Sequence, residues 1–304
     1  MMQKKELAVQ LKARTQGDVR IDESMSLHTS FKIGGPADVL VIPKVEQDIA
    51  AVLAFARETE TPLTVLGNGS NVLVRDKGIR GIVLILGNTL KYARRDGSRF
   101  VFSAGLSLAA ASRLAGEAGL TGLEFAVGIP GSIGGALYMN AGAYDGEMKD
   151  VVVSARLLEE DGTERTVPGA ELHLSYRHSL LQEQHAIVLD ITTELCPGDR
   201  DAIQRKMEDF SHRRTSKQPL EMPSAGSTFR RPAGHFVGPM IEKAGLKGFR
   251  VGGAEVSRKH AGFVVNAGGA TAADVLGLIR HIQETIRRTD GVDLVPEVLI
   301  LGEE

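Results

Sequence analysis

Two glycine-rich loops are the part of the sequence best suited to bind a charged ligand. Residues 66–71 read Leu-Gly-Asn-Gly-Ser-Asn, and residues 128–135 contain four more glycines. Glycine lets the main chain approach a ligand closely, and successive backbone N–H groups can hold a diphosphate without a cluster of lysines. Either loop alone could be an ordinary turn. Together they favour a dinucleotide cofactor.

The surrounding sequence excludes the commonest nucleotide motifs. The first loop is not the G-x-G-x-x-G fingerprint, because residue 72 is Val and no helical pattern follows it. The sequence contains no Walker A motif, which argues against an ordinary NTPase. If a diphosphate is bound, the site must therefore be built from loops of another kind.

Composition narrows the class of protein further. The 304 residues carry a formal net charge of −2, so no global field indicates nucleic acid or an acidic membrane as a partner. Trp is absent, and the aromatic platforms of single-strand binders are not evident. Cys196 is the only cysteine, and neither a disulfide nor a metal site is expected. Without a signal core or an apolar run near the ~20 residues of a membrane span, we expect a cytoplasmic location.

Hydrophobic spacing predicts alternating helices and strands, and hence a protein with mixed α and β structure. Ser107 is a suitable N-cap, and Thr271 with Asp274 resembles a capping box. The composition changes near Cys196, where we place a domain boundary. Helices are expected over residues 3–14, 45–59, 107–118, 199–212 and 272–288, and strands over 37–43, 63–66, 72–74, 82–86, 100–104, 151–159, 186–194 and 295–301.

Four segments resemble one family in the order in which that family carries them. Residues 66–76 resemble the flavin pyrophosphate loop of the UDP-N-acetylenolpyruvoylglucosamine reductases, and residues 128–144 resemble their second flavin loop. Residues 29–37 and 252–263 resemble their N-terminal and C-terminal signatures. The direct run from Lys217 to Ser227 is similar to the compact type II branch, which lacks an insertion over the substrate.

The resemblance implies an α+β fold with a two-lobed FAD-binding region of the vanillyl-alcohol-oxidase/PCMH type. It implies an N-terminal helical segment (1–20), an FAD-binding domain (21–197, with lobes of about 21–88 and 89–197) and a C-terminal substrate domain (198–304). The residues expected to bind the cofactor are Gly67, Asn68, Gly69, Ser70, Asn71, Gly128, Ile129, Pro130, Gly131, Ser132, Gly134, Asn140 and Arg214.

The same resemblance implies a reaction. NADPH would reduce FAD, and flavin N5 would pass hydride to UDP-N-acetylglucosamine enolpyruvate to give UDP-N-acetylmuramate for peptidoglycan. The expected partners are thus this small-molecule substrate, FAD and NADPH, with no nucleic acid, membrane or obligate protein partner. The reaction needs a group that stabilises charge on the substrate carboxylate and a proton for the adjacent carbon.

Three residues match the family's catalytic set. Ser227 is expected to donate the proton, although by itself the serine could equally belong to a turn. Arg177 matches the catalytic arginine, and a permanently charged, bidentate guanidinium suits a carboxylate. Glu297 stands among apolar neighbours, where an unpaired carboxylate is costly. It could donate as a neutral acid or orient Arg177.

Basic residues near the predicted boundary could bind phosphate groups. Arg214 is the expected cofactor contact within the stretch 212–217, and Lys217 and Arg231 are expected substrate contacts. Two positions depart from the family pattern. Arg231 follows Arg230 where the family usually has Lys-Asn, and Leu299 replaces a common arginine. Both departures concern contacts of the substrate or flavin rather than the catalytic set. Tyr138 and Asn140 could equally be structural.

Two other functions remain compatible with the loops. One is an oxidase of the same flavoprotein superfamily, whose members often attach FAD through His or Cys; neither loop contains such a residue. The other is a nucleotide-binding protein without activity, which would have no use for Arg177, Ser227 and Glu297 together.

Overall fold

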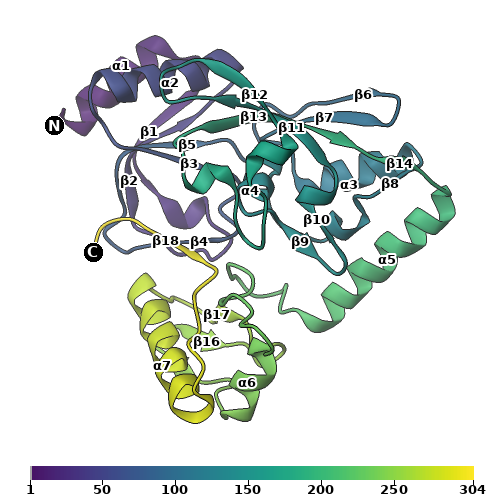
Figure 1. The fold of residues 1–304 in the computed structure, drawn as a ribbon. Helices are drawn as coiled ribbons and strands as arrows, with labels where there is room; N and C mark the ends of the chain where they lie inside the picture. The colour runs from purple at the N-terminus through teal and green to yellow at the C-terminus, as the bar shows by residue number, and fades with distance from the viewer. Residues whose placement is uncertain (1) are drawn as a thin grey trace. The chain divides into compact units, whose positions relative to one another are not determined.

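Residues 2–304 are described by a computed structural model, and they fall into two units (Figure 1). The first unit contains the chain up to residue 21, residues 39–68 and residues 81–214. The second contains residues 22–38, 69–80 and 215–304. The chain therefore passes between the units several times. The sequence suggests a boundary after residue 197, between the FAD-binding domain and the substrate domain. This functional boundary stays a prediction.

The first unit has two separate hydrophobic cores. One core lies between two helices and a sheet of strand order β1-β2-β5-β3, in which β3 and β5 are parallel. The first glycine loop begins where β3 ends. The elements of this core are α1 (Lys4–Arg14), α2 (Glu46–Glu58), β1 (Asp18–Ser24), β2 (Pro36–Ile42), β3 (Leu63–Leu66) and β5 (Ile79–Ile85).

The other core of this unit surrounds an antiparallel sheet of order β12-β11-β13-β7-β6. The second glycine loop leads into a short helix, α4, which packs in this core, so each loop belongs to a different core. The main elements are β6 (Ala93–Asp96), β7 (Arg99–Ser103), β11 (Val152–Leu158), β12 (Glu164–Pro168), β13 (Ile187–Glu194), α3 (Leu108–Glu117), α4 (Ile133–Tyr138) and α5 (Arg200–Lys217). Two short pairs complete it: β8 (Leu120–Thr121) with β14 (Cys196–Pro197), and β9 (Gly142–Ala143) with β10 (Gly146–Glu147).

The second unit is organised around one long helix, α7 (Ala272–Asp290), which lies along a small antiparallel sheet (Figure 1). Its apolar stripe, including Val275, Ile279 and Ile282, is buried in the core of this unit. The remaining elements are β4 (Val72–Val74), α6 (Val237–Lys243), β15 (Arg250–Val251), β16 (Ala254–Val256), β17 (Val264–Asn266) and β18 (Leu299–Leu301), with β4 and β18 paired in parallel.

Two acidic side chains fix the N-terminus of α7. Thr271 and Asp274 form the predicted capping box. In addition, the carboxylate of Asp76 accepts hydrogen bonds from the backbone N–H groups of Ala272 (2.8 Å) and Ala273 (2.9 Å). Both carboxylates satisfy helix donors that have no partner inside the helix and complement its dipole. Asp76, which follows the first glycine loop, thus connects that segment to the C-terminal helix.

Most predicted elements are confirmed, including the N-cap at Ser107, whose hydroxyl accepts from the Ala110 N–H. The predicted strand over 295–301 is wrong in its first half, because only Leu299–Leu301 form a strand with β4. Pro296 has no N–H to donate, and the neighbouring residues bond residues 228–230 instead. The predicted helix over 199–212 extends to Lys217.

A cluster of ionisable groups joins the two cores of the first unit. Arg156 on β11 donates two hydrogen bonds of 2.7 Å to the two oxygens of Glu46 on α2. It also donates to Asp190 (2.9 Å) and Glu164 (2.9 Å). Tyr92 donates to Asp190 at 2.6 Å, and burial together with this carboxylate raises the pKa of Tyr92 to about 12. The Arg156 side chain is 27% exposed, so solvent screens the cluster only in part.

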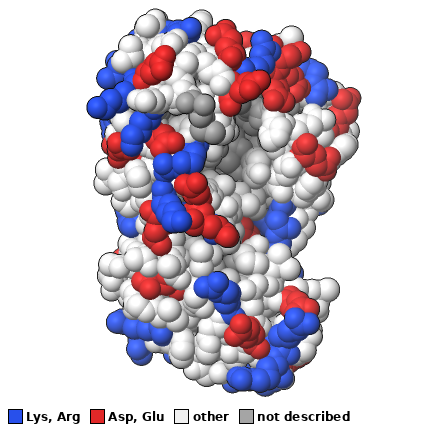
Figure 2. Space-filling model, turned by 90° about the vertical axis from the view of Figure 1, so that its left-hand side faces the viewer, with Lys and Arg blue, Asp and Glu red and all other residues white. Residues whose placement is uncertain are grey.

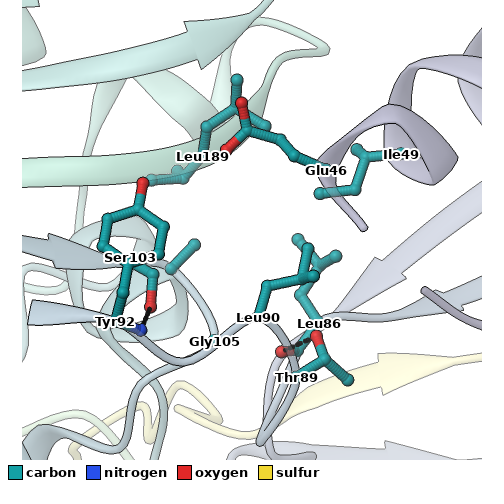
Figure 3. A pocket seen from close by; sticks show the side chains of 11 residues that line it. Glu46, Ile49, Leu86, Thr89, Leu90, Tyr92, Ser103, Gly105 and Leu189 are labelled. Carbon is teal, nitrogen blue, oxygen red and sulfur yellow. Dashed lines mark hydrogen bonds between the residues drawn. The ribbon is translucent and has the colours of Figure 1, made fainter. Parts of the chain in front are cut away.

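A cavity lies beside this cluster and is shown in Figure 3. It holds about 250 Å³ of empty space, counting its opening, and is lined mainly by apolar side chains of α2, β7, β13 and the segment 86–92. Two of its polar side chains, those of Glu46 and Tyr92, also belong to the cluster. No predicted site residue of the described chain lines it, which gives it a structural character.

Arg156→Met should destabilise the protein, because it leaves the carboxylates of Glu46, Glu164 and Asp190 close together without their cation. We expect a loss of about 2–3 kcal/mol, below the range for fully buried pairs. Thermal unfolding measures the change. Arg165→Met is the matched control, because Arg165 forms an exposed pair with Glu159 and should cost less than about 1 kcal/mol. Equal losses in the two variants would show that the cluster adds no stability.

Candidate active site

The two glycine loops meet within the first unit. A Cβ atom at Gly67 would lie 2.3 Å from the hydroxyl oxygen of Ser132, which is closer than non-bonded atoms can approach. Asn68, the next residue, points toward Gly87, where a Cβ would lie 2.3 Å from its Oδ1 atom. The two loops, which together favour a dinucleotide cofactor, are thus brought together at Gly67 and Ser132.

The second loop is fixed by hydrogen bonds on both sides. The hydroxyl of Ser132 accepts from the Gly135 N–H (3.3 Å) and caps α4. Gly131 accepts from the Leu108 N–H and has a φ of 153°, and Gly134 donates to Ala104. A Cβ at Gly134 would lie 3.1 Å from that of Ala104, so glycine permits close packing of α4 on this segment. Ile129 and Pro130 complete the turn, in which Ile129 donates to Ala126.

Arg214, near the C-terminal end of α5, lies against the second loop. A Cβ at Gly128 would lie 2.7 Å from the Cδ atom of Arg214. The Nε atom of Arg214 is buried and has no hydrogen-bond partner within the described chain. Burial lowers the pKa of its guanidinium, an effect that the charge of Tyr144 partly opposes. A half-buried cation with a buried, unsatisfied donor beside a glycine loop is suited to an anionic ligand.

The rest of the first loop belongs to the second unit. Gly69 has a φ of 59°, and a Cβ there would lie 2.1 Å from the carbonyl oxygen of His28. Its own carbonyl accepts from the N–H of Ser30, whose hydroxyl donates to the Ser224 carbonyl at 2.6 Å. Ser30 therefore bonds both residue 69 and residue 224, which the sequence placed in two other motifs. Ser70 lies within this segment.

Glu297 and Ser227 lie in one hydrogen-bonded frame of the second unit. The N–H of Glu297 donates to the carbonyl of Thr228, the residue after Ser227, at 2.9 Å. The carbonyl of Glu297 accepts from the side-chain amide of Asn71 at 3.2 Å, and Asn71 in turn accepts from the Leu299 N–H. The main chain at Glu297 is thus held between the first glycine loop and the Ser227 segment.

The Ser227 segment is itself fixed by the C-terminal signature. Thr228 donates its N–H to Gly262, and its hydroxyl accepts from the N–H of Val264 at 2.9 Å. Gly226 has a φ of 77°, which turns the chain directly before Ser227. The hydroxyl of Ser227 donates to the Phe229 carbonyl at 3.3 Å, a long bond that leaves it able to take another partner.

Arg177 belongs to the first unit and lies at the end of a tight turn. Ser175 and His178 exchange backbone hydrogen bonds of 3.2 and 3.1 Å around it. Arg177 has a φ of 56°, an uncommon conformation for a residue with a side chain. Its guanidinium lies 5.0 Å from the centre of the Tyr176 ring.

The remaining predicted residues differ in their surroundings. Asn140 is fully buried, and its side chain bonds Glu147, Lys149 and Ser175 of the protein, which supports the structural alternative; its predicted role at the cofactor stays a prediction. Lys217, the last residue of α5, is exposed. Arg231 is exposed, donates to the His235 carbonyl and lies 3.9 Å from the centre of the Phe236 ring.

Three features of the site were not predicted from the sequence. Arg230 has a buried Nε atom without a partner in the part of the chain that the structure describes, as Arg214 does. Two further residues of the site are Gly87 and Ser30. Gly87 contacts Asn68, and the N–H of Ser30 donates to the carbonyl of Gly69. Arg230 could have been found from its position three residues after Ser227. Gly87 gives no local signal, since its role depends on an approach between distant segments.

Other kinds of site find little support. Among residues 2–304, no group of three His, Cys, Asp or Glu side chains could hold a metal ion, and no helix is long and apolar enough to cross a membrane. Cys196 is exposed and unpaired. On the face shown in Figure 2, Lys and Arg side chains are interspersed with Asp and Glu. Binding of an anion must therefore depend on local groups such as Arg214.

Comparison with known proteins defines the class and then the family. The family model of an FAD binding domain matches residues 37–167, which contain both glycine loops, and the chain is thus an FAD-binding oxidoreductase. The model "UDP-N-acetylenolpyruvoylglucosamine reductase, C-terminal domain" matches residues 218–301. The chain belongs to the UDP-N-acetylenolpyruvoylglucosamine reductase family, as the resemblance in sequence predicted.

Similarity to members of this family extends over nearly the whole chain. The reductase of Lactobacillus delbrueckii subsp. bulgaricus is 51% identical over 96% of this chain and 98% of its own length. That of Pediococcus pentosaceus is 50% identical over 93% and 94%. The solved reductase structure from Thermus caldophilus has a TM-score of 0.81 at 34% identity and covers 94% of this chain and 99% of its own. The predicted α+β fold, with an FAD-binding region and a C-terminal domain, is confirmed.

The residues of the first unit fit FAD. Gly67 and the loop at 128–135 bring main chain close together, and Arg214 offers a half-buried cation for a diphosphate. The Oδ1 atom of Asn68 is likewise buried without a partner in the described residues. A half-turn of this amide presents either an acceptor to a hydroxyl or a donor to a phosphate.

Arg214→Met should weaken FAD binding while leaving the fold intact. A lost charge-assisted hydrogen bond of about 1.5–3 kcal/mol corresponds to roughly 10–100-fold in the dissociation constant. The cofactor-free variant should be at least as stable as the unaltered protein, because a half-buried charge with a buried, unsatisfied Nε donor is removed. Flavin fluorescence titration and thermal unfolding measure the two effects. Arg213→Met is the control, since Arg213 is exposed and pairs with Asp209. Unchanged FAD affinity in Arg214→Met would remove Arg214 from the cofactor site.

Proposed function

We propose that the protein uses NADPH to reduce UDP-N-acetylglucosamine enolpyruvate to UDP-N-acetylmuramate, a step in the synthesis of peptidoglycan precursors. Relatives at 50–51% identity over more than nine-tenths of the chain support this substrate. The structural observation that carries the proposal is the shared frame of Ser227 and Glu297, next to the loop residue Asn71. We expect the reaction in the cytoplasm, with no nucleic acid, membrane or obligate protein partner.

The reaction makes two demands on the protein. Bound FAD, reduced by NADPH, supplies the hydride for the terminal carbon of the enolpyruvyl group. The electron pair of the double bond is then delocalised into the carboxylate of the substrate, and the carbon next to the ether oxygen must receive a proton. The protein therefore needs a cation for the carboxylate and an acid that faces this carbon.

Ser227 is suited to the role of the acid. A hydroxyl is a weak acid in water, but a carbanion-like carbon is a strong base, so a well-placed hydroxyl suffices. Unlike a carboxylic acid, it also keeps its proton at neutral pH. Thr228 and Gly226 fix the main chain on both sides of Ser227, and its own hydrogen bond to Phe229 is long. Breaking this long hydrogen bond to reach the substrate would therefore cost the hydroxyl little free energy.

Arg177 and Glu297 are proposed to stabilise the negative charge on the substrate. Arg177 stays charged at every relevant pH and can bind a carboxylate through two parallel hydrogen bonds. Glu297 is half-buried, and its backbone is held at both N–H and C=O. Glu297 either donates a hydrogen bond to the substrate as a neutral carboxylic acid or orients Arg177.

Ser227→Ala separates the two halves of the reaction. Reduction of bound FAD by NADPH should proceed at the unaltered rate, because it requires no proton from Ser227. Transfer to the enolpyruvyl substrate should slow ~10²–10⁴-fold, the usual contribution of a general acid. Anaerobic stopped-flow measurement of flavin absorbance reports each half separately. Equal slowing of both halves would argue against Ser227 as the acid, and Ser216→Ala, in α5, serves as the control substitution.

Glu297→Gln distinguishes the two roles of this residue. An amide still donates a hydrogen bond but carries no charge to hold an arginine. If Glu297 acts as a neutral donor, the variant should keep substrate reduction within about tenfold, the value of a single weakened hydrogen bond. A loss of more than ~10²-fold would assign Glu297 the role of orienting Arg177. The pH dependence of the second half-reaction is the companion measurement, because titration of Glu297 disappears in the variant.

A further inference from the structure

The turn that carries Arg177 needs support from the rest of the first unit. Arg177 has a φ of 56°, and a residue with a side chain held in this region is strained. The two backbone hydrogen bonds between Ser175 and His178 close the turn but do not fix its direction. A guanidinium must be aimed to bind a carboxylate through both nitrogens. The contacts at the base of the turn therefore decide where Arg177 points.

Asn140 provides one of the fully buried contacts at this turn. Its side chain has no exposed surface. The amide nitrogen donates to the carbonyl of Ser175, at the base of the turn, at 2.9 Å, and to the carboxylate of Glu147 at 2.8 Å. The amide oxygen accepts from the backbone N–H of Lys149 at 2.9 Å. Both amide protons and one oxygen lone pair are thus used by the protein.

The other side of the turn is held at the end of α4. The hydroxyl of Ser179 and the side-chain amide of Gln182 both donate to the carbonyl of Tyr138, at 2.7 and 2.8 Å. Gln182 also donates to the carbonyl of Arg177 itself at 3.1 Å. Helix α4 is capped by Ser132 of the second glycine loop and begins at Ile133. Six residues of helix therefore connect the proposed cofactor loop to the turn of Arg177.

The backbone of Asn140 explains why this position suits asparagine. Its φ is 40°, in the left-handed region that asparagine tolerates better than other residues with side chains. At this φ its side chain bonds Ser175 on one side and Glu147 and Lys149 on the other. Aspartate would keep the shape but lose both donors, whereas glycine would keep the backbone and lose the amide.

We infer that Asn140 is a positioning residue for Arg177, which holds the Arg177 turn at a fixed distance from the second glycine loop. The inference rests on the proposed function, in which Arg177 binds the carboxylate of the substrate. It also replaces direct cofactor binding as the role of Asn140, because the amide is already bonded within the protein. Asn140 therefore acts on the second half-reaction and not on the first.

The test compares both half-reactions in Asn140→Gly and Asn140→Asp. Reduction of bound FAD by NADPH should stay within about twofold, the limit for independent sites. Transfer to the enolpyruvyl substrate should slow about 10²-fold, the usual effect of a small misplacement of a catalytic group. In an Arg177→Ala background, Asn140→Gly should change transfer by less than about twofold, because its effect is exerted through Arg177. Full additivity of the two changes overturns the inference.

Glu147→Gln is the matched control. The glutamine carbonyl still accepts from the amide of Asn140, and the bond from Asn140 to Ser175 is untouched. This variant should therefore transfer hydride at a rate within about twofold of the unaltered enzyme. A slowing equal to that of Asn140→Gly would show that the whole cluster is merely structural, and it would contradict a specific role for the contact with Ser175.

Hydrogen exchange of the flavin-bound protein tests the inference without the substrate. The backbone N–H groups of Ser175 and His178 should exchange at least about tenfold faster in Asn140→Gly, because the turn loses its buried anchor. They should be unchanged in Glu147→Gln. If the unaltered enzyme fails to reduce the enolpyruvyl substrate, the proposed function fails, and faster exchange still supports Asn140 as the anchor of this turn. Unchanged exchange in Asn140→Gly overturns the inference whatever the activity.

Discussion

The backbone of Glu297 is the constraint on which the second unit depends. Its N–H bonds Thr228 and its carbonyl is bonded by Asn71, so segments more than 200 residues apart in sequence are held in register. Pro296 forces the change of partner, because it cannot donate to a regular strand. One side of this short segment fixes the chain beside Ser227, and the other fixes the first glycine loop. Ser227 and Glu297 thus obtain defined positions without a long strand to carry them.

The first unit solves a different problem, that of binding an anionic cofactor in a protein with a slight negative charge. The proposed site combines close main-chain approach at Gly67 and Ser132 with one half-buried cation, Arg214, whose Nε atom is buried and has no partner in the described residues. A buried unpaired group lowers stability, and it persists where a ligand supplies the missing partner. The turn of Arg177 has a strained backbone, and a hydrogen bond from the buried amide of Asn140 to Ser175 supports it.

The sequence predicted the parts of the molecule that depend on local chemistry. The capping box at Thr271, the cap at Ser107, the long helices and the convergence of two glycine loops follow from residue type and spacing. The partial strand at 295–301 was misjudged, because apolar spacing does not report which segment lies alongside. The cap that Asp76 provides to α7 and the contact of Asn140 with Ser175 join distant residues, and no local pattern predicts them. The roles of Arg177, Ser227 and Glu297 depended on the family resemblance.

We propose that this flavoprotein delivers its electrons to an enolpyruvyl sugar nucleotide. The most direct measurement reduces the FAD-loaded protein with NADPH under anaerobic conditions, adds UDP-N-acetylglucosamine enolpyruvate and follows the flavin absorbance. Prompt reoxidation with formation of UDP-N-acetylmuramate is the predicted result. Reduced flavin that ignores the enolpyruvyl compound but is reoxidised by air would contradict the claim and indicate an oxidase.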